Sequence, residues 1–130
     1  MANTEHLNLP VVAASQAQKH VTVNESLYAL DAIVQLAVID KDLTSPPGSP
    51  TAGDRYIVGA SATGDWAGQD GNIAAYQNSA WEFYTPQEGW LAYVKDEAVD
   101  YRYDGSSWSQ FQAAATANGA ATEVYCVLRS

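Results

Sequence analysis

The side chains that could act as nucleophiles, general bases or metal ligands in this sequence are few and far apart. There is one cysteine, Cys126, and there are two histidines, His6 and His20. The cysteine lies in the apolar run 124–128, which favours a small buried side chain over a reactive thiolate. Neither histidine is close in sequence to Cys126 or to an acidic cluster, so no Cys–His or Ser–His–Asp arrangement is indicated. No pair has the spacing of zinc ligands.

Two overlapping loop segments share some features with ligand-binding loops. Residues 59–65 (GASATGD) are glycine-rich, but they lack the Gly-Lys-Ser/Thr ending of a phosphate loop. Residues 65–72 (DWAGQDGN) offer oxygen ligands, but they lack the closing glutamate of an EF-hand. We read the whole segment as a surface loop, with calcium binding as a minor alternative.

Acidic residues do not indicate an enzyme either. The chain has fifteen of them, so chance pairs such as Glu82 and Glu88 carry no information about glycoside hydrolysis, which needs two carboxylates at a set separation. The sequence therefore predicts a protein that is not an enzyme and that has no cofactor.

Aromatic side chains remain as candidates for binding, since the chain contains 4 Trp and 8 Tyr. Their flat rings could stack on sugar rings, but rings of this kind more often fill a core or a subunit interface. We favour packing for most of them. The candidates for a glycan platform or an interface are Trp66, Trp81, Trp90, Trp108, Tyr76 and Tyr103.

A short unit that occurs twice indicates how these aromatics are held. Residues 76–81 read YQNSAW and residues 103–108 read YDGSSW. An aromatic residue, a polar turn and a tryptophan form the pattern of a tight β-hairpin. Strand-like segments crowd the same half of the chain, at residues 73–76, 81–85, 90–95, 100–103 and 108–111. They predict a small antiparallel meander or barrel-like sheet.

The first half of the chain predicts one amphipathic helix. Residues 22–25 (TVNE) fit a capping box with Thr22 as the N-cap. Apolar residues then follow at spacings of four, three and four, which places them on one stripe of a helix that ends near Val34. They are Val23, Leu27, Leu30 and Val34.

Two further strands are expected in the first half, at residues 36–39 and 54–59. The loop between them, residues 45–53, is rich in proline and glycine. The fold class is therefore mainly β (α+β), with one N-terminal helix and extended terminal arms.

The chain divides into three parts. Residues 1–20 are predicted to form an extended N-terminal arm that holds the protein to a neighbour. Residues 21–111 are predicted to form a single helix-plus-β-meander domain. Residues 112–130 read as a low-complexity flexible linker followed by a C-terminal strand. The candidate assembly residues of the arm are Leu9, Pro10, Gln16, Gln18, Lys19 and His20.

The charge balance excludes two classes of partner. Six basic residues are scattered among fifteen acidic ones, giving a formal charge of -9. A protein needs a stripe of basic residues to bind nucleic acid or an anionic membrane surface. The start has no signal-peptide pattern, and no apolar run is long enough to span a bilayer. We expect no nucleic-acid partner, no membrane insertion and folding in a cytoplasm.

Several segments together resemble a known family. They are residues 9–10 with 16–25 (QAQKHVTVNE), then 30–32 (LDA), 42–47 (DLTSPP), 53–58 (GDRYIV) and 66–71 (WAGQDG). In this order they resemble a family of domains of unknown function found in phages and gene transfer agents of alphaproteobacteria. The resemblance covers about residues 7–108. The family has no established catalytic residues, so none are carried over.

The resemblance implies a virion component. In gene transfer agents the domain resembles the base of head spikes, which sit on capsid vertices and carry fibres that touch the host's surface polysaccharide. The implied function is a head-spike base or fibre-attachment module, made in the cytoplasm of a bacterial host. Its implied partners are capsid vertex or tail proteins and a fibre protein.

The small core favours a homo-oligomer, either a pentamer that matches a capsid vertex or a trimer that matches a fibre. The alternative function is a carbohydrate-binding module that recognises host surface polysaccharide through its aromatics. An enzyme is a distant third.

Overall fold

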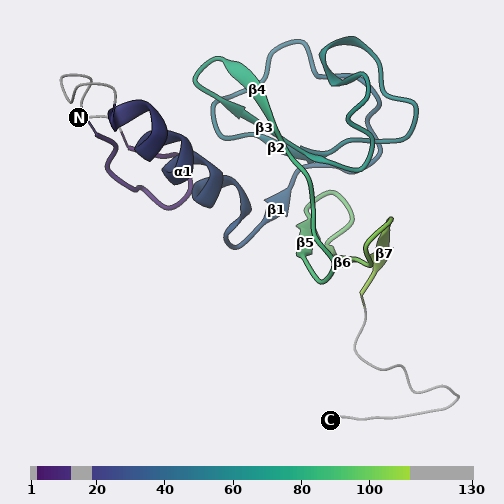
Figure 1. Ribbon diagram of the computed structural model, residues 1–130. Helices are drawn as coiled ribbons and strands as arrows, with labels where there is room; N and C mark the ends of the chain where they lie inside the picture. Colours follow the sequence, from purple (N-terminus) through teal and green to yellow (C-terminus); the bar gives the residue numbers. More distant parts are fainter. Residues whose placement is uncertain (1–2, 13–18, 112–130) are drawn as a thin grey trace, which may run out of the picture.

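The computed structural model describes residues 3–12 and 19–111, and the side chains of these except at residues 19–21. One helix, α1 (Lys19–Ile33), precedes the strands (Figure 1). The strands are β1 (Ala37–Val38), β2 (Arg55–Ile57), β3 (Ile73–Gln77), β4 (Ala80–Tyr84), β5 (Leu91–Val94), β6 (Val99–Tyr103) and β7 (Trp108–Gln110). A 3-10 turn, η1 (Gly64–Trp66), lies between β2 and β3. Within the described ranges, no helix is long and apolar enough to cross a membrane.

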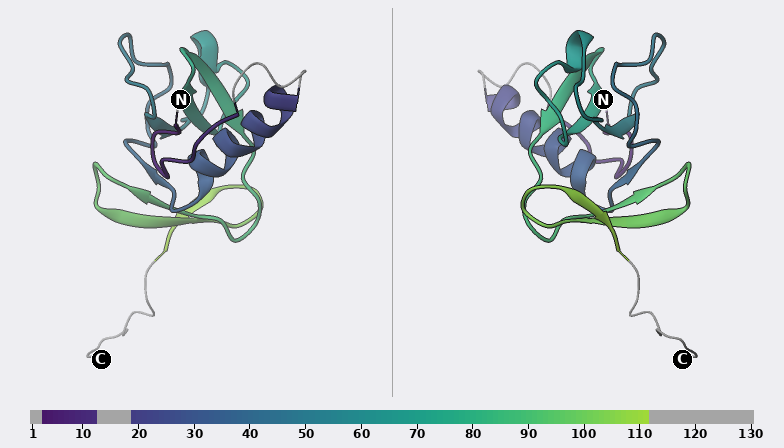
Figure 2. Two further views of the ribbon diagram at one scale, coloured as in Figure 1. Left: turned by 90° about the vertical axis from the view of Figure 1, so that its left-hand side faces the viewer. Right: turned by 90° about the vertical axis from the view of Figure 1, so that its right-hand side faces the viewer.

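The strands form two sheets (Figures 1 and 2). One has the order β1-β5-β6-β7 and the other β2-β3-β4. Every pairing is antiparallel except the short parallel pair of β1 and β5. The mainly β, α+β prediction is therefore confirmed, but the strands form neither one continuous meander nor a closed barrel. A buried proline, Pro86, lies between β4 and β5, and a proline has no backbone N–H with which to continue a ladder.

The main core lies where the two sheets meet. Val38, Ala92 and Val94 come from the four-stranded sheet, and Ile57 and Ile73 come from the three-stranded sheet. All five are at most 3% exposed. The chain after β1 joins the sheets, because the N–H of residue 39 donates to the carbonyl of residue 55 at 2.8 Å.

A second core cluster lies on the other face of the three-stranded sheet. Tyr56, Val58 and Ala74 pack there against Trp66, which the loop after β2 carries. Residues 59–72 are thus more than a surface loop, because they cover this face with a fully buried indole. Both faces of the three-stranded sheet are covered as a result.

The repeated sequence unit forms two hairpins, as predicted. Tyr76 pairs with Trp81 across β3 and β4, and Tyr103 pairs with Trp108 across β6 and β7. The first hairpin turns at Asn78 and Ser79, which have φ angles of 53° and 64°. Two residues with positive φ are the signature of the tight turn that suits twisted strands.

The helix differs from its prediction at its start and in its orientation. It begins at Lys19, so Thr22 is not an N-cap; its carbonyl accepts a bond from the Ser26 hydroxyl inside the helix. The predicted end near Val34 is confirmed. The apolar stripe points outward instead of into the core, since Leu30 is 47% exposed. Polar side chains hold the opposite side, as described below.

The first described segment is not an extended arm. Residues 3–12 double back, with a bridge between Asn3 and Pro10, and run alongside α1 (Figure 2). Thr4 and Val11 are buried. The N–H of Val12 donates to the side chain of Asn24, whose amide donates back to the Val12 carbonyl. This segment is therefore part of the folded domain.

Candidate functional site

The predicted aromatic platform divides into two separate groups. Trp66 and Trp81 belong to the second core cluster, with ring centroids 5.2 Å apart. The Tyr76 ring packs on Trp81, with centroids 5.1 Å apart. Trp66 is fully buried, and Trp81 is half-buried. These rings pack edge to face, which stabilises aromatic pairs.

The other group lies on the four-stranded sheet. The rings of Tyr103 and Trp108 are 5.2 Å apart, and the Trp108 indole N–H donates to the carbonyl of Gly71 at 2.8 Å. Trp90 is half-buried as well. The six candidates therefore do not form one solvent-facing platform.

One group lines an open groove of about 520 Å³ beside the β3–β4 hairpin. Its aromatic wall consists of Tyr76, Trp81 and Phe83, all half-buried. The opposite wall is the proline-rich loop, with Pro46 and Pro47. Flat apolar walls of this kind can accept a sugar ring or another apolar ligand.

A second groove, of about 430 Å³, lies between α1 and the same hairpin. Its lining combines tyrosines, carboxylates and amides, and includes Tyr28, Tyr84, Glu25 and Glu82. Burial, followed by the nearby charge of Glu82, raises the pKa of Tyr84 to about 12. Its hydroxyl stays protonated and donates to the Gln77 side chain at 2.9 Å. Sequence reasoning missed this groove because its residues come from distant segments.

A buried carboxylate joins the N-terminal segment to the helix. Asp31 is 1% exposed and accepts hydrogen bonds from the backbone N–H groups of His6 and Leu7. Burial alone would raise the pKa of Asp31. Hydrogen bonds from the Thr4 side chain and the two N–H groups outweigh that effect, so this pKa lies below its ordinary value.

The same region contains a buried arginine. Arg55 is 5% exposed, and its guanidinium donates to the carbonyl of Ala32 at 3.0 Å, near the end of α1. This bond holds the helix end to β2. A small cavity of about 40 Å³ is lined by both Arg55 and Asp31. Burial lowers the pKa of Arg55, and the charge of Asp31 opposes that shift.

Gly53 lets the N-terminal segment approach the loop that precedes β2. Its φ is +93°, and a Cβ there would lie 2.8 Å from the Cβ of Glu5. Its carbonyl lies 2.7 Å from Nε2 of His6, so the tautomer with a proton on Nε2 is the one that donates there. A side chain at position 53 would therefore push residues 5 and 6 away from the sheet.

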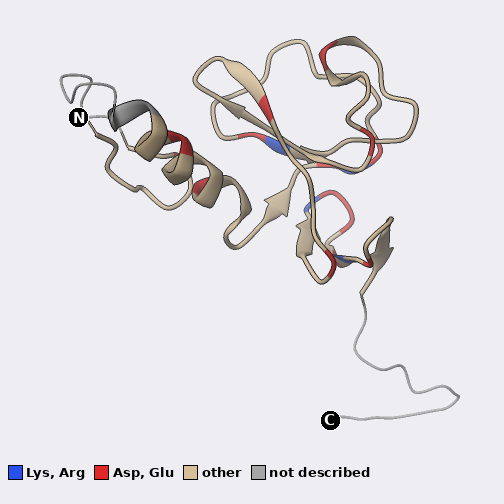
Figure 3. Ribbon diagram, in the orientation of Figure 1, with Lys and Arg blue, Asp and Glu red and all other residues tan. Residues whose placement is uncertain are grey.

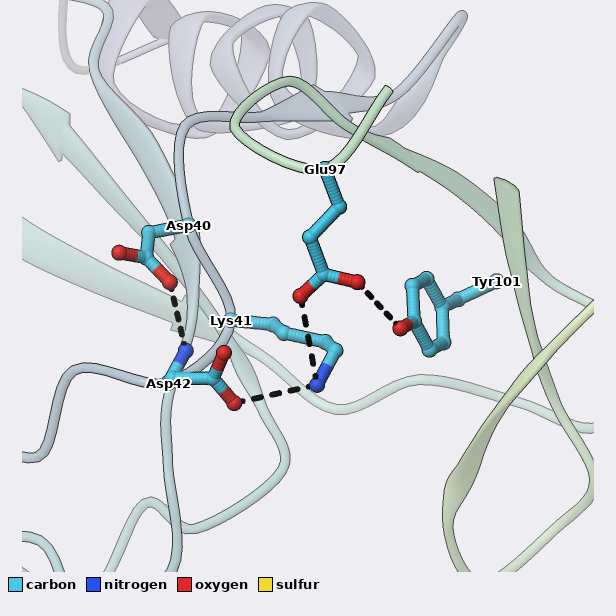
Figure 4. A network of polar contacts seen from close by, with 5 residues as sticks. All are labelled: Asp40, Lys41, Asp42, Glu97 and Tyr101. Atoms are coloured by element: carbon cyan, nitrogen blue, oxygen red, sulfur yellow. Dashed lines mark hydrogen bonds and ion pairs between the residues drawn. The ribbon is translucent and has the colours of Figure 1, made fainter. Parts of the chain in front are cut away.

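An acidic cluster surrounds one lysine at the β5–β6 turn (Figure 4). The Lys41 ammonium lies 3.1 Å from Asp42 and 3.6 Å from Glu97. It also lies 4.9 Å from the ring centroid of Tyr101, whose hydroxyl donates to Glu97. Burial would lower the pKa of Lys41, but the hydrogen bond and charge of Asp42, together with Tyr101 and Glu97, raise this pKa overall. The cluster ties the loop after β1 to this turn.

The loop proposed as a minor calcium candidate uses its aspartate internally. The Asp70 carboxylate accepts from the N–H groups of Ser61 and Ala62 at 2.8 and 3.0 Å. These bonds lower the pKa of Asp70. Among the residues that the structure describes, no three His, Cys, Asp or Glu side chains gather as a metal site.

The predicted arm residues have different positions. Leu9 and Pro10 lie in the folded N-terminal segment, while Lys19 and His20 form the first turn of α1. Gln16 and Gln18 fall outside the described residues, as do Cys126 and the predicted C-terminal strand at 122–128. The assembly role of these residues stays a prediction.

The apolar stripe predicted from the sequence of α1 is left exposed by the described part of the chain. Val23, Leu30 and Val34 are 42%, 47% and 38% exposed. Acidic residues occur at only two places along the described part of the helix, Glu25 and Asp31 (Figure 3). The stripe itself carries no charge.

Comparison with known proteins places most of this domain in one family. A search of curated proteins found no match. The sequence profile of a family described as protein of unknown function (DUF2793) matches residues 23–109, which include most of α1, both hairpins and nearly all of β7. The match covers more than half of the 130 residues. The chain therefore belongs to the DUF2793 family of proteins of unknown function.

Proposed function

We propose that this chain is a structural virion protein, the head-spike base or fibre-attachment module of a tailed phage or gene transfer agent. In this role it joins the capsid or tail to host-recognition fibres. The proposal begins with the sequence resemblance over residues 7–108. The structural observation that supports it most is the exposed, uncharged stripe of α1, because a building block needs a surface on which copies associate.

The occupant we propose for the stripe is α1 of another copy. Spacings of four, three and four are those of the seam along which like helices pack. The neighbouring positions Thr22, Ser26 and Ala29 are also uncharged. Two chains of charge -9 repel each other, so a contact without carboxylates is the one they can make at lowest electrostatic cost.

Replacing Leu30 with glutamate is expected to convert the homo-oligomer into a monomer. Desolvating one carboxylate per copy costs several kcal/mol. Association is expected to weaken by more than about a hundredfold, and light scattering of the purified protein measures the change in mass. The fold should persist, because Leu30 is 47% exposed within one chain.

The matched control is Leu91→Glu, the same change at a leucine that is 48% exposed on a different surface. It should leave the mass unchanged. A wild-type monomer, or a Leu30→Glu variant that keeps the wild-type mass, would contradict the stripe as the contact. The virion part is tested separately: the Leu30→Glu chain should be missing from purified particles, whereas the control chain should be present.

A carbohydrate-binding module is the second candidate, favoured by the groove with Tyr76, Trp81 and Phe83. Removing one stacking ring with Tyr76→Ala should weaken binding of host surface polysaccharide by about tenfold, which corresponds to 1.4 kcal/mol. Tyr103→Ala is the matched control, since it removes the same ring from the other copy of the repeated unit. Equal effects of both changes, or no binding by the wild type, would remove this candidate.

A further inference from the structure

The four-stranded sheet has one covered face and one open face. Along β5, Ala92 and Val94 point into the core and are at most 1% exposed. Leu91 and Tyr93 alternate with them and are 48% and 41% exposed. Phe111, just after β7, is 38% exposed. Apolar residues of this size on one sheet face indicate that something covers it.

The open face contains a hollow and carries few charges. A hollow of about 520 Å³ lies beside the end of α1 and is lined by Ala37, Leu91 and Tyr93. The pairing register places Asp100 opposite Tyr93 and Arg102 opposite Leu91, so the face carries one charge of each sign on β6. A largely apolar segment with a single charge could therefore lie across it, since the face offers one charge of each sign.

The described chain ends on this same face. The N–H of Phe111 donates to the carbonyl of Asp100 at 2.8 Å. The Arg102 guanidinium lies 4.1 Å from the centroid of the Phe111 ring. Figure 2 shows the yellow-green end of the described chain leaving from this sheet. Phe111 therefore lies against β6, whose Asp100 and Arg102 pair with Tyr93 and Leu91 on the next strand.

We propose that residues 122–128 (TEVYCVL) of the same chain pack on this open face. The ten residues before them, 112–121, span up to about 33 Å when extended, more than the width of four strands spaced about 4.8 Å apart. Residues 112–130 contain one acidic and one basic side chain, Glu123 and Arg129. Residues 112–130 therefore carry no net side-chain charge, and the acidic domain does not repel them as it would repel another acidic segment.

The short connection favours the segment's own chain over a neighbour. A tether of this length holds the segment at a millimolar effective concentration. A separate copy that is not already associated through α1 reaches that concentration only in very concentrated solution. This inference does not depend on the proposed virion role.

The unique cysteine allows a direct test in the full-length protein. Leu91→Cys places a second thiol on the open face, and a short bis-maleimide joins it to Cys126. The control is Gln110→Cys, on β7 but paired with Tyr101, whose ring packs toward the core. Position 110 is closer to the tether, so a segment that only diffuses would react there faster.

The expected result is an intramolecular crosslink from Leu91→Cys that forms about tenfold faster than from Gln110→Cys, as judged by the mass of the joined peptides. Removing residues 112–130 should also increase binding of a hydrophobic dye to the domain. Equal rates at the two positions, or crosslinks that join two chains, would overturn the proposal. Unchanged dye binding after the truncation would do the same.

Discussion

Replacing Asp31 with alanine is expected to lower the free energy of unfolding by about 3–5 kcal/mol. The Asp31 carboxylate is 1% exposed and is the acceptor for the N–H groups of His6 and Leu7. Alanine leaves both donors without an acceptor, removes the partner of the Thr4 side chain and takes away the negative charge that favours the charged form of Arg55. Urea unfolding followed by tryptophan fluorescence measures the loss.

Asp65→Ala is the control, because Asp65 is exposed and the change there should stay within about 0.5 kcal/mol. Hydrogen exchange adds a local readout: the amides of residues 6 and 7 should lose protection in Asp31→Ala before the strands do. A variant with wild-type stability would show that the N-terminal segment does not depend on this carboxylate.

The stability that Asp31 contributes should depend on pH in one direction. Its pKa in the folded protein is lower than the ordinary value of 3.8. The contribution is therefore fully present above about pH 4 and is lost as the pH falls through the folded pKa. In Asp31→Asn this loss is absent, so the stability difference from wild type should shrink in acid. A difference that stays constant down to pH 2 would contradict the lowered pKa.

Local patterns allowed the hairpins to be predicted from sequence. The turn residues Asn78 and Ser79 accept positive φ, and each flanking aromatic pair meets across two strands. Such information lies within six consecutive residues. The strand at residues 54–59 could be placed for a similar reason, since it follows the proline- and glycine-rich loop 45–53. The strand at residues 36–39 could be placed because it is short, apolar and partly β-branched.

The buried side of α1 could not be predicted, because periodicity identifies a stripe but not what covers it. The rule that apolar residues face the core failed at Leu30. The helix is held instead by Asp31 and Asn24, which bond to the backbone of residues 6–7 and 12. These contacts join positions 12 to 25 residues apart, and no helical pattern contains them.

The division into two sheets was also beyond sequence reasoning. It depends on β1 pairing in parallel with β5, more than fifty residues away. Two residues of β1 carry that pairing, Ala37 and Val38. The candidate grooves follow from the same long-range arrangement, because each combines the β3–β4 hairpin with a segment from the first half of the chain.

Replacing Trp66 with alanine is expected to cost about 3–5 kcal/mol of unfolding free energy. The indole is fully buried under the loop after β2, and its ring centroid lies 5.5 Å from that of Tyr56 and 5.2 Å from that of Trp81. Alanine would leave a cavity between the loop and the three-stranded sheet. Thermal and urea unfolding measure the cost.

Phenylalanine at the same position separates packing from polarity. The Trp66 indole N–H is buried and has no hydrogen-bond partner among residues 3–12 and 19–111, so the wild type already bears the cost of desolvating it. Trp66→Phe loses part of the ring contact but also removes that unpaired donor, and its net cost should be only about 1–2 kcal/mol. A Phe variant as unstable as the Ala variant would mean that the N–H is satisfied in solution, for example by a bound water. The loop over the second core cluster would then depend on that hydrogen bond as well as on the aromatic rings.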